Sequence, residues 1–147
     1  MPNILLYLLW MMWWYDVFMD FFKHYLTAAA IFVAIDSVWL TAVAGKFYKK
    51  ELGPLLAKKA NLKPAAVFYA LYIVGMVVFA INPALRQHSL SYVIKYAALL
   101  GLTMYATYDL TNHSTLKNWP AKVTYVDMAW GTVITTVVST LTFLIFN

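Results

Sequence analysis

Three aspartates lie inside stretches of the chain that are otherwise long and apolar enough to cross a membrane: Asp36, Asp109 and Asp127. A carboxylate at the centre of a bilayer costs about 2.5 to 3.5 kcal/mol on insertion scales, so we expect all three to face the interior of a helix bundle. No Lys or Arg is predicted at the same depth. A proton, a cation or a basic ligand must therefore compensate any of these carboxylates that lacks a hydrogen-bonding partner.

Polar and aromatic residues share helical faces with these aspartates, because residues three and four apart are adjacent on a helix. Asp36 and Asp127 each have a tryptophan three residues on, and an indole N–H can satisfy a buried carboxylate on its own helix. Asp109 is followed at the same spacings by an asparagine and by His113. We therefore predict a ligand-binding site formed by Asp36, Trp39, Tyr108, Asp109, Asn112, Asp127 and Trp130.

Metal binding at this site would use oxygen ligands. Asp36, Asp109 and Asp127 are the candidate metal ligands, and a divalent cation is the candidate cofactor, because Mg²⁺ and Ca²⁺ prefer carboxylates. The chain has no cysteine and three histidines without a His-x-x-x-His pair, which argues against thiolate and zinc sites. No residue is assigned a catalytic role.

The last apolar stretch carries polar and small residues along nearly one line: Asp127, Gly131, Thr135, Ser139 and Thr142. Membrane helices use small and hydroxylated residues to pack closely, so we interpret this line chiefly as a packing surface. The pattern Asp-x-x-Trp-x-Thr begins at both Asp36 and Asp127. It is either an inverted internal repeat or a coincidence of common residues.

The overall composition is that of a membrane protein. Of 147 residues, 63% are hydrophobic and 12% are charged, whereas a soluble domain carries about a quarter charged residues. This composition argues against a soluble enzyme and against nucleic-acid binding as the main role. Four apolar stretches match the thickness of a bilayer and predict an all-α fold, a polytopic membrane four-helix bundle with spans at about 25–44, 65–81, 92–111 and 123–146.

The first 18 residues form a separate unit in this interpretation. Residues 1–18 are hydrophobic, lack a basic segment and a cleavage site, and contain three tryptophans, so we predict an additional N-terminal interfacial helix. A fifth span is an alternative, and a start at Met19 would place these residues upstream of the true protein. Residues 19–147 make the four-span membrane domain.

Charge predicts the orientation. Eight Lys lie in the connections between spans one and two and between spans three and four, against three Lys or Arg on the other side. The positive-inside rule therefore places both Lys-bearing connections in the cytoplasm and both termini outside it. We further expect spans one, three and four to enclose the carboxylates and span two, residues 65–81, to pack outside them.

Several short motifs together resemble the family known as domain of unknown function 2177 (DUF2177), small bacterial membrane proteins. The resemblance covers about residues 19–146 and depends on Asp36-x-x-Trp39, Phe47-Tyr48, Leu52-Gly53, Phe68-Tyr69, Tyr72, Tyr108-Asp109-Leu110-Thr111-Asn112 and Asp127-x-x-Trp130-Gly131. It implies a four-span protein of the bacterial inner membrane with no established activity. The family pattern does not require His113, which lowers the rank of this residue.

Three functions remain open from the sequence. The first is binding or transport of a small cation, a proton or a basic solute at a cytoplasm-facing carboxylate pocket, where four spans are few and a homodimer or larger membrane complex is expected. The second is a membrane-embedded enzyme acting on a lipid or isoprenoid, with paired aspartates as acid and base or as Mg²⁺ ligands. The third is a structural or assembly subunit of another membrane protein. Membrane lipid is the partner that all three share.

Overall fold

The structure, a computed structural model, describes residues 4–147, and all regular structure in this range is helical. The all-α prediction is therefore confirmed. Short π-helical and 3₁₀ segments interrupt the α-helices. The elements are α1 (Ile4–Val38), a π-helical turn (Trp39–Val43), α2 (Gly45–Leu52), a 3₁₀ turn (Gly53–Leu55), α3 (Leu62–Met76), a second π-helical turn (Val77–Ile81), α4 (Asn82–Gln87), α5 (Leu90–Thr115) and α6 (Ala121–Phe146).

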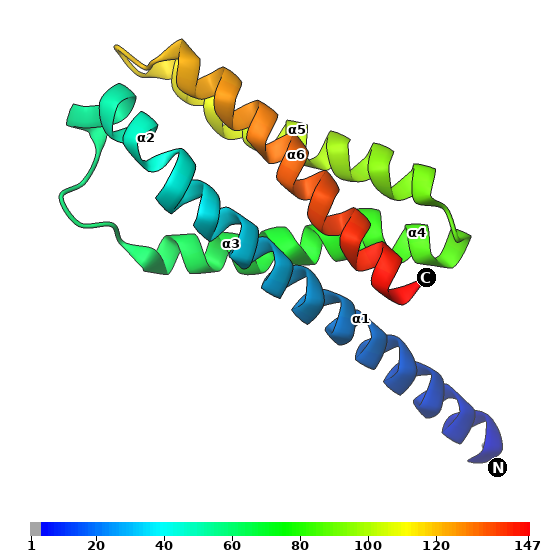
Figure 1. Cartoon of the computed structure of the whole chain (residues 1–147). Helices are drawn as coiled ribbons and strands as arrows, with labels where there is room; N and C mark the ends of the chain where they lie inside the picture. Colours follow the sequence, from blue (N-terminus) through cyan, green and yellow to red (C-terminus); the bar gives the residue numbers. More distant parts are fainter. Residues whose placement is uncertain (1–3) are drawn as a thin grey trace.

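These elements form four long rods, because α3, the second π-helical turn and α4 follow one another without a break. Helices α5 and α6 run side by side as an antiparallel hairpin, and α1 crosses the rod formed by α3 and α4 (Figure 1). The sequence predicted that the second span ends before Pro83, but the rod continues to Gln87. Pro83 lies in the first turn of α4, directly after the π-helical turn, where a missing backbone N–H is tolerated.

Three helical segments in the described range are long and apolar enough to cross a membrane: Leu6–Val43, Leu62–Gln87 and Ala121–Phe146. Helix α5 has the same 26-residue length as α6 but is less apolar. By composition alone, α5 is therefore not one of the candidate membrane spans. The predicted spans at 92–111 and 123–146 coincide with α5 and α6. The polytopic membrane character is thus supported, while a fourth span at α5 stays a prediction.

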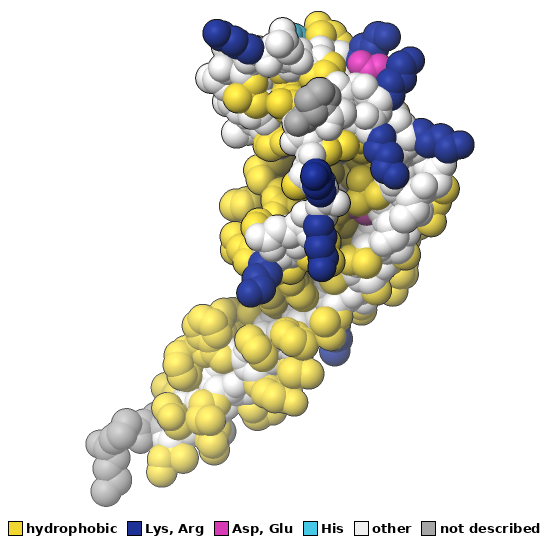
Figure 2. Space-filling model, turned by 90° about the vertical axis from the view of Figure 1, so that its left-hand side faces the viewer, with side chains coloured by type: hydrophobic (Ala, Val, Ile, Leu, Met, Phe, Trp, Pro, Cys, Tyr) yellow, Lys and Arg dark blue, Asp and Glu magenta, His cyan; other side chains and the backbone are white. Residues whose placement is uncertain are grey.

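The N-terminal region differs from the predicted arrangement. Residues 4–18 are not a separate helix, because α1 continues through them from Ile4 to Val38 without a break. This end of α1 projects beyond the other helices, and its surface is almost entirely hydrophobic (Figure 2). Residues 1–3 of the predicted interfacial segment lie outside the described range. Sequence periodicity missed the continuity because the stretch is mostly apolar and has no Pro or Gly between Pro2 and Gly45.

Glycines set the close approach of α5 and α6. A Cβ atom added at Gly101 would overlap the carbonyl oxygen of Gly131, and one added at Gly131 would overlap the ring of Tyr105. Both positions are buried. The small-residue line predicted on the last span is therefore a packing surface, with Thr135, Ser139 and Thr142 fully buried along it.

The hydrophobic core lies between α1, the rod of α3 and α4, and α6. Phe32 on α1, Met76 at the end of α3 and Ile134 on α6 are each fully buried and belong to one cluster. A second, smaller cluster joins the end of this rod to the start of α5 and the last turns of α6. Phe32 of this core lies one helical turn before Asp36 on α1.

Candidate functional site

Asp36 is a buried carboxylate with a partner for each oxygen. Its side chain on α1 is 6% exposed. The Tyr69 hydroxyl on α3 donates to Oδ2 at 2.5 Å, and the Trp130 indole Nε1 on α6 donates to Oδ1 at 3.1 Å. Asp36 therefore connects α1, α3 and α6 through two hydrogen bonds to its carboxyl oxygens. Hydrogen bonds to a charged acceptor are stronger than those between neutral groups.

Asp127 has a different partner, which comes from the short helix α2. The Tyr48 hydroxyl donates to Oδ1 of Asp127 at 2.6 Å, and the Trp39 indole Nε1 donates in turn to the Tyr48 hydroxyl oxygen at 3.4 Å. Burial, together with the bond to Asp127, raises the pKa of Tyr48 above its ordinary range. The phenol therefore stays protonated and remains a donor to Asp127 at neutral pH.

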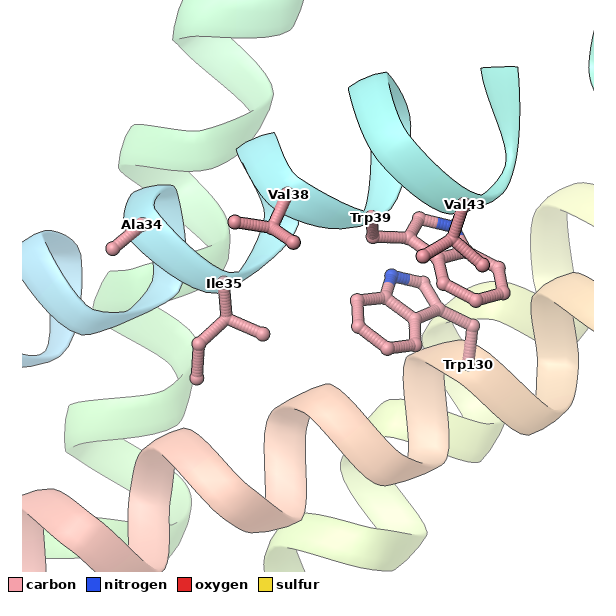
Figure 3. A pocket seen from close by; sticks show the side chains of 6 residues that line it. All are labelled: Ala34, Ile35, Val38, Trp39, Val43 and Trp130. Atoms are coloured by element: carbon pink, nitrogen blue, oxygen red, sulfur yellow. The ribbon is translucent and has the colours of Figure 1, made fainter. Parts of the chain in front are cut away.

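The two Asp-x-x-Trp motifs exchange their tryptophans. Trp130 of the second motif binds Asp36 of the first, whereas Trp39 of the first reaches Asp127 of the second through Tyr48. The two indoles stack between these bonds, with ring centroids 4.1 Å apart and planes 8° from parallel. Figure 3 shows the rings facing each other across the gap between α1 and α6.

This exchange corrects the expectation that each indole satisfies the carboxylate on its own helix. Helices α1 and α6 run in opposite directions. A step of three residues toward the C-terminus therefore leads one way along the bundle in α1 and the other way in α6. Trp130 therefore comes level with Asp36, and Trp39 comes level with Asp127. The echo between the two motifs thus corresponds to an approximately symmetric antiparallel contact.

A π-helical turn explains how the chain brings α2 over Asp127. In this turn, Trp39–Val43, the Ala44 backbone N–H bonds to the carbonyl oxygen of Trp39 at 2.7 Å, one residue farther than in an α-helix. A Cβ atom at Gly45 would lie 2.8 Å from the carbonyl oxygen of Leu40, so glycine fits there best. The chain then turns into α2, which packs on α6 and carries Tyr48. Inserted residues of this kind are frequent at functional sites.

Asp109 contrasts with the other two aspartates. Its side chain on α5 is 0% exposed, and neither Oδ1 nor Oδ2 has a hydrogen-bond partner within the described residues. Burial disfavours the charged form of this carboxyl group, and the negative charge of Asp127 adds a smaller unfavourable effect. A buried carboxylate in this position requires a proton or a cation.

The remaining predicted site residues lie at the edge of this arrangement. Tyr108 is largely exposed, and its ring meets that of Trp119 edge-on at 6.0 Å. Asn112 is half-buried one turn beyond Asp109. His113 is exposed, and its Nδ1 lies 3.5 Å from the hydroxyl of Thr124, which agrees with its low rank in the sequence.

Residues 65–81 do not pack outside the carboxylates, contrary to the prediction. Tyr69 on α3 binds Asp36, and the Tyr72 hydroxyl lies 2.6 Å from Oγ1 of Thr135 in the centre of the bundle. Tyr72 is 3% exposed. The spacing of Tyr69, Tyr72 and Met76 along one helical face was the available signal, and the strong hydrophobicity of the span concealed it.

The candidate metal site is not assembled as predicted. Within residues 4–147, no group of three or more His, Cys, Asp or Glu side chains is arranged to hold a metal ion. Asp36 is occupied by its two donors, which leaves Asp109 and Asp127 as neighbouring carboxylates. An apolar groove of about 430 Å³ lies beside the stacked indoles (Figure 3), lined by Ala34, Ile35, Val38, Trp39, Val43 and Trp130.

Comparison with known families agrees with the helical architecture and the motifs. The family described as predicted membrane protein, DUF2177, matches residues 21–144, which include every aspartate, tyrosine and tryptophan of the carboxylate network. The chain belongs to the DUF2177 family. No curated protein and no solved structure matches it significantly. Family membership therefore establishes a predicted membrane protein of unknown function, and the chemistry must be argued from the site.

Proposed function

We propose that this DUF2177 protein binds a proton at the neighbouring carboxylates of Asp109 and Asp127, at the Lys-rich end of the bundle. The observation that carries the proposal is that Asp109 is fully buried while both of its oxygens lack a partner. Within the described residues the one ion pair, Lys23 with Asp20, involves neither Asp109 nor Asp127. A proton on Asp109 removes the charge that burial disfavours and also the repulsion from Asp127.

The other ligands considered for this site have less support. A basic solute needs a polar cavity, whereas the groove beside Trp39 and Trp130 is lined by apolar residues. A divalent cation needs several oxygen ligands, and within the described residues no three His, Cys, Asp or Glu side chains are grouped to hold one. A monovalent cation between Asp109 and Asp127 is the closest competitor of the proton, and the experiment below separates the two.

A second candidate function uses the same network differently. The groove of about 430 Å³ opens beside the indoles that adjoin Asp36 and Tyr48. A lipid or isoprenoid chain fits such an apolar surface, which favours the enzyme alternative more than transport. Asp36 itself fits the structural alternative, because its two oxygens are already satisfied by donors from two other helices.

Infrared difference spectroscopy in lipid vesicles tests proton binding directly. Wild-type protein should show the stretching band of a protonated carboxylic acid that disappears as the pH is raised. Asp109→Asn should abolish this band or shift its titration, since the shared site is lost. Asp20→Asn is the matched control, because Asp20 is an exposed carboxylate in the described part of the chain. A band that persists unchanged in both Asp109→Asn and Asp127→Asn would contradict the proposal, and loss of the band on adding Na⁺ or K⁺ would assign the site to a cation.

We also propose a topology, which determines the side of the membrane that the site faces. Four spans, with α5 as the third, would place the chain in the bacterial inner membrane with both termini outside the cytoplasm. The support is that the two Lys-bearing connections, around α2 and between α5 and α6, lie at the same end of the bundle (Figure 1).

Cysteine labelling checks the orientation without background, because the natural chain has no cysteine. An impermeant maleimide added to intact cells should label Ser89→Cys, between α4 and α5, and should leave Ala57→Cys, between α2 and α3, unlabelled until the cells are opened. The reverse pattern would invert the topology.

A further inference from the structure

A second cleft lies at the opposite end of the bundle from the carboxylates. It has a volume of about 630 Å³ and is bounded by α1, α4 and the last turn of α6. Its walls combine charged residues with aromatic ones: Lys23, Arg86, His24, Trp13 and Phe146. None of these residues takes part in the network around Asp36, Asp109 and Asp127.

The polar wall of the cleft is built by contacts between two helices. His24 Nδ1 on α1 lies 2.7 Å from Oδ1 of Asn82 on α4, and an amide oxygen accepts, so Nδ1 donates. The ring of His24 meets the ring of Phe146 edge-on at 4.6 Å. The His24 side chain is therefore held between α4 and α6.

The cleft carries an excess of positive charge. Lys23 and Arg86 face one acidic residue, Asp20, which bonds Lys23 at 3.2 Å. Arg86 donates from Nε to the backbone oxygen of Asn82 at 3.4 Å, and within residues 4–147 no carboxylate pairs with it. A guanidinium fixed at one nitrogen still presents donors in the fork that suits a phosphate group.

The other wall suits hydrocarbon. Trp13 lies on the end of α1 that projects beyond the other helices, where the exposed surface is hydrophobic (Figure 2). Phe146 closes the cleft from the last turn of α6. A ligand in this cleft therefore meets cations at one side and an apolar surface at the other.

We propose that the cleft binds the headgroup of an anionic phospholipid, with the phosphate on Arg86 and Lys23 and the acyl chains along Trp13 and the hydrophobic surface of α1. The charge of the cleft selects an anion, and the adjoining apolar wall selects a lipid over a free phosphate. Basic pockets between membrane helices bind such headgroups, and each cation near a charged surface adds measurably to the affinity. This proposal is independent of proton binding at Asp109.

The test uses the full chain in neutral detergent. Phosphatidylglycerol should bind in native mass spectra and raise the melting temperature, whereas phosphatidylcholine and inorganic phosphate should do so far less. The double variant Lys23→Gln, Arg86→Gln should bind phosphatidylglycerol about tenfold more weakly, because two cations near the phosphate are lost. Circular dichroism should show unchanged helix content, since both side chains are exposed.

Lys95→Gln supplies the matched control. It removes one positive charge, as Lys23→Gln or Arg86→Gln alone does, from an exposed position on α5 on the side of the chain that also bears Lys23 and Arg86, but Lys95 does not line the cleft. Equal loss of lipid in Lys95→Gln would show general charge attraction and overturn the site. Inorganic phosphate that protects wild-type protein as well as phosphatidylglycerol does would overturn the assignment to a lipid.

Discussion

Asp36 and Asp109 are both buried carboxylates on long helices of one bundle, yet their surroundings are opposite. Asp36 accepts bonds from Tyr69 and Trp130, whereas Asp109 has no partner for either oxygen within the described chain. The first is the arrangement of a structural cross-link, in which donors from two helices fix a third. The second is a buried carboxyl group without a hydrogen-bond partner, and a bound proton can neutralise its charge. Burial alone does not distinguish the two roles, but the donors around each group do.

The comparison predicts that removing the carboxylate of Asp36 is the most damaging change. Asp36→Ala leaves the Tyr69 hydroxyl and the Trp130 indole without an acceptor. An orphaned buried donor costs about 1 to 3 kcal/mol, and both side chains are half-buried, so each loss stays below the top of that range. We therefore expect the free energy of unfolding in mixed micelles to fall by about 2 to 5 kcal/mol. Asp36→Asn keeps one acceptor oxygen and should lose roughly half as much. A wild-type unfolding curve for Asp36→Ala would remove the structural half of the comparison.

Tyr48→Phe should have an intermediate effect. It removes the donor to Asp127 and the acceptor for Trp39, and we expect a loss of about 1 to 2 kcal/mol in the same unfolding assay. Because the pKa of Tyr48 is raised, the phenol keeps its proton below its ordinary pKa of 10.0 in the folded and unfolded states alike. Titration of Tyr48 therefore adds no pH dependence to stability below that pH, and it lowers stability only above it. A loss that disappears well below that pH would show that the bond is absent there.

Asp109→Asn should have the smallest effect and the opposite sign. Asparagine matches the shape of aspartate but removes the charge that repels Asp127, so stability at neutral pH should rise by about 1 kcal/mol. Melting temperatures of wild type and variant, measured at neutral and at acidic pH, give the answer. The gain should shrink at acidic pH, where a proton already neutralises the wild-type site. Destabilisation at both pH values would place Asp109 in the same structural class as Asp36.

The sequence predicted the class of fold and the membrane environment because both follow from local properties. Long apolar stretches specify helices, and the positions of 92–111 and 123–146 correspond to α5 and α6. Burial of Asp36 and Asp109 was also predictable, since a charged group in an apolar helix is costly unless it faces the interior of the bundle. The small-residue line on α6 identified the surface that packs closely on α5.

The partners of the carboxylates were not predictable by the same reasoning. Spacing along a chain reports which residues share a face, but it contains no information on how two helices are rotated and offset. The exchange of Trp39 and Trp130 depends on the antiparallel offset of α1 and α6, and Tyr48 reaches Asp127 only through the π-helical turn. Residues 4–18 show the converse problem, because a stretch that is apolar except for Asp16 gives little signal for where one helix ends.

The stack of Trp39 and Trp130 also has an optical consequence. Two nearly parallel indoles with centroids 4.1 Å apart couple their electronic transitions, which splits the near-ultraviolet circular dichroism of the pair. Trp10, Trp13 and Trp14 also lie close to one another, with ring centroids 5.8 Å apart for Trp10 and Trp14 and 5.4 Å apart for Trp13 and Trp14, so they couple as well. The difference between the spectra of wild type and Trp39→Phe isolates the signal of the Trp39–Trp130 stack, which reports the docking of α1 on α6 without an added label. Its disappearance during a denaturation series would time the separation of these two helices independently of the loss of helical backbone.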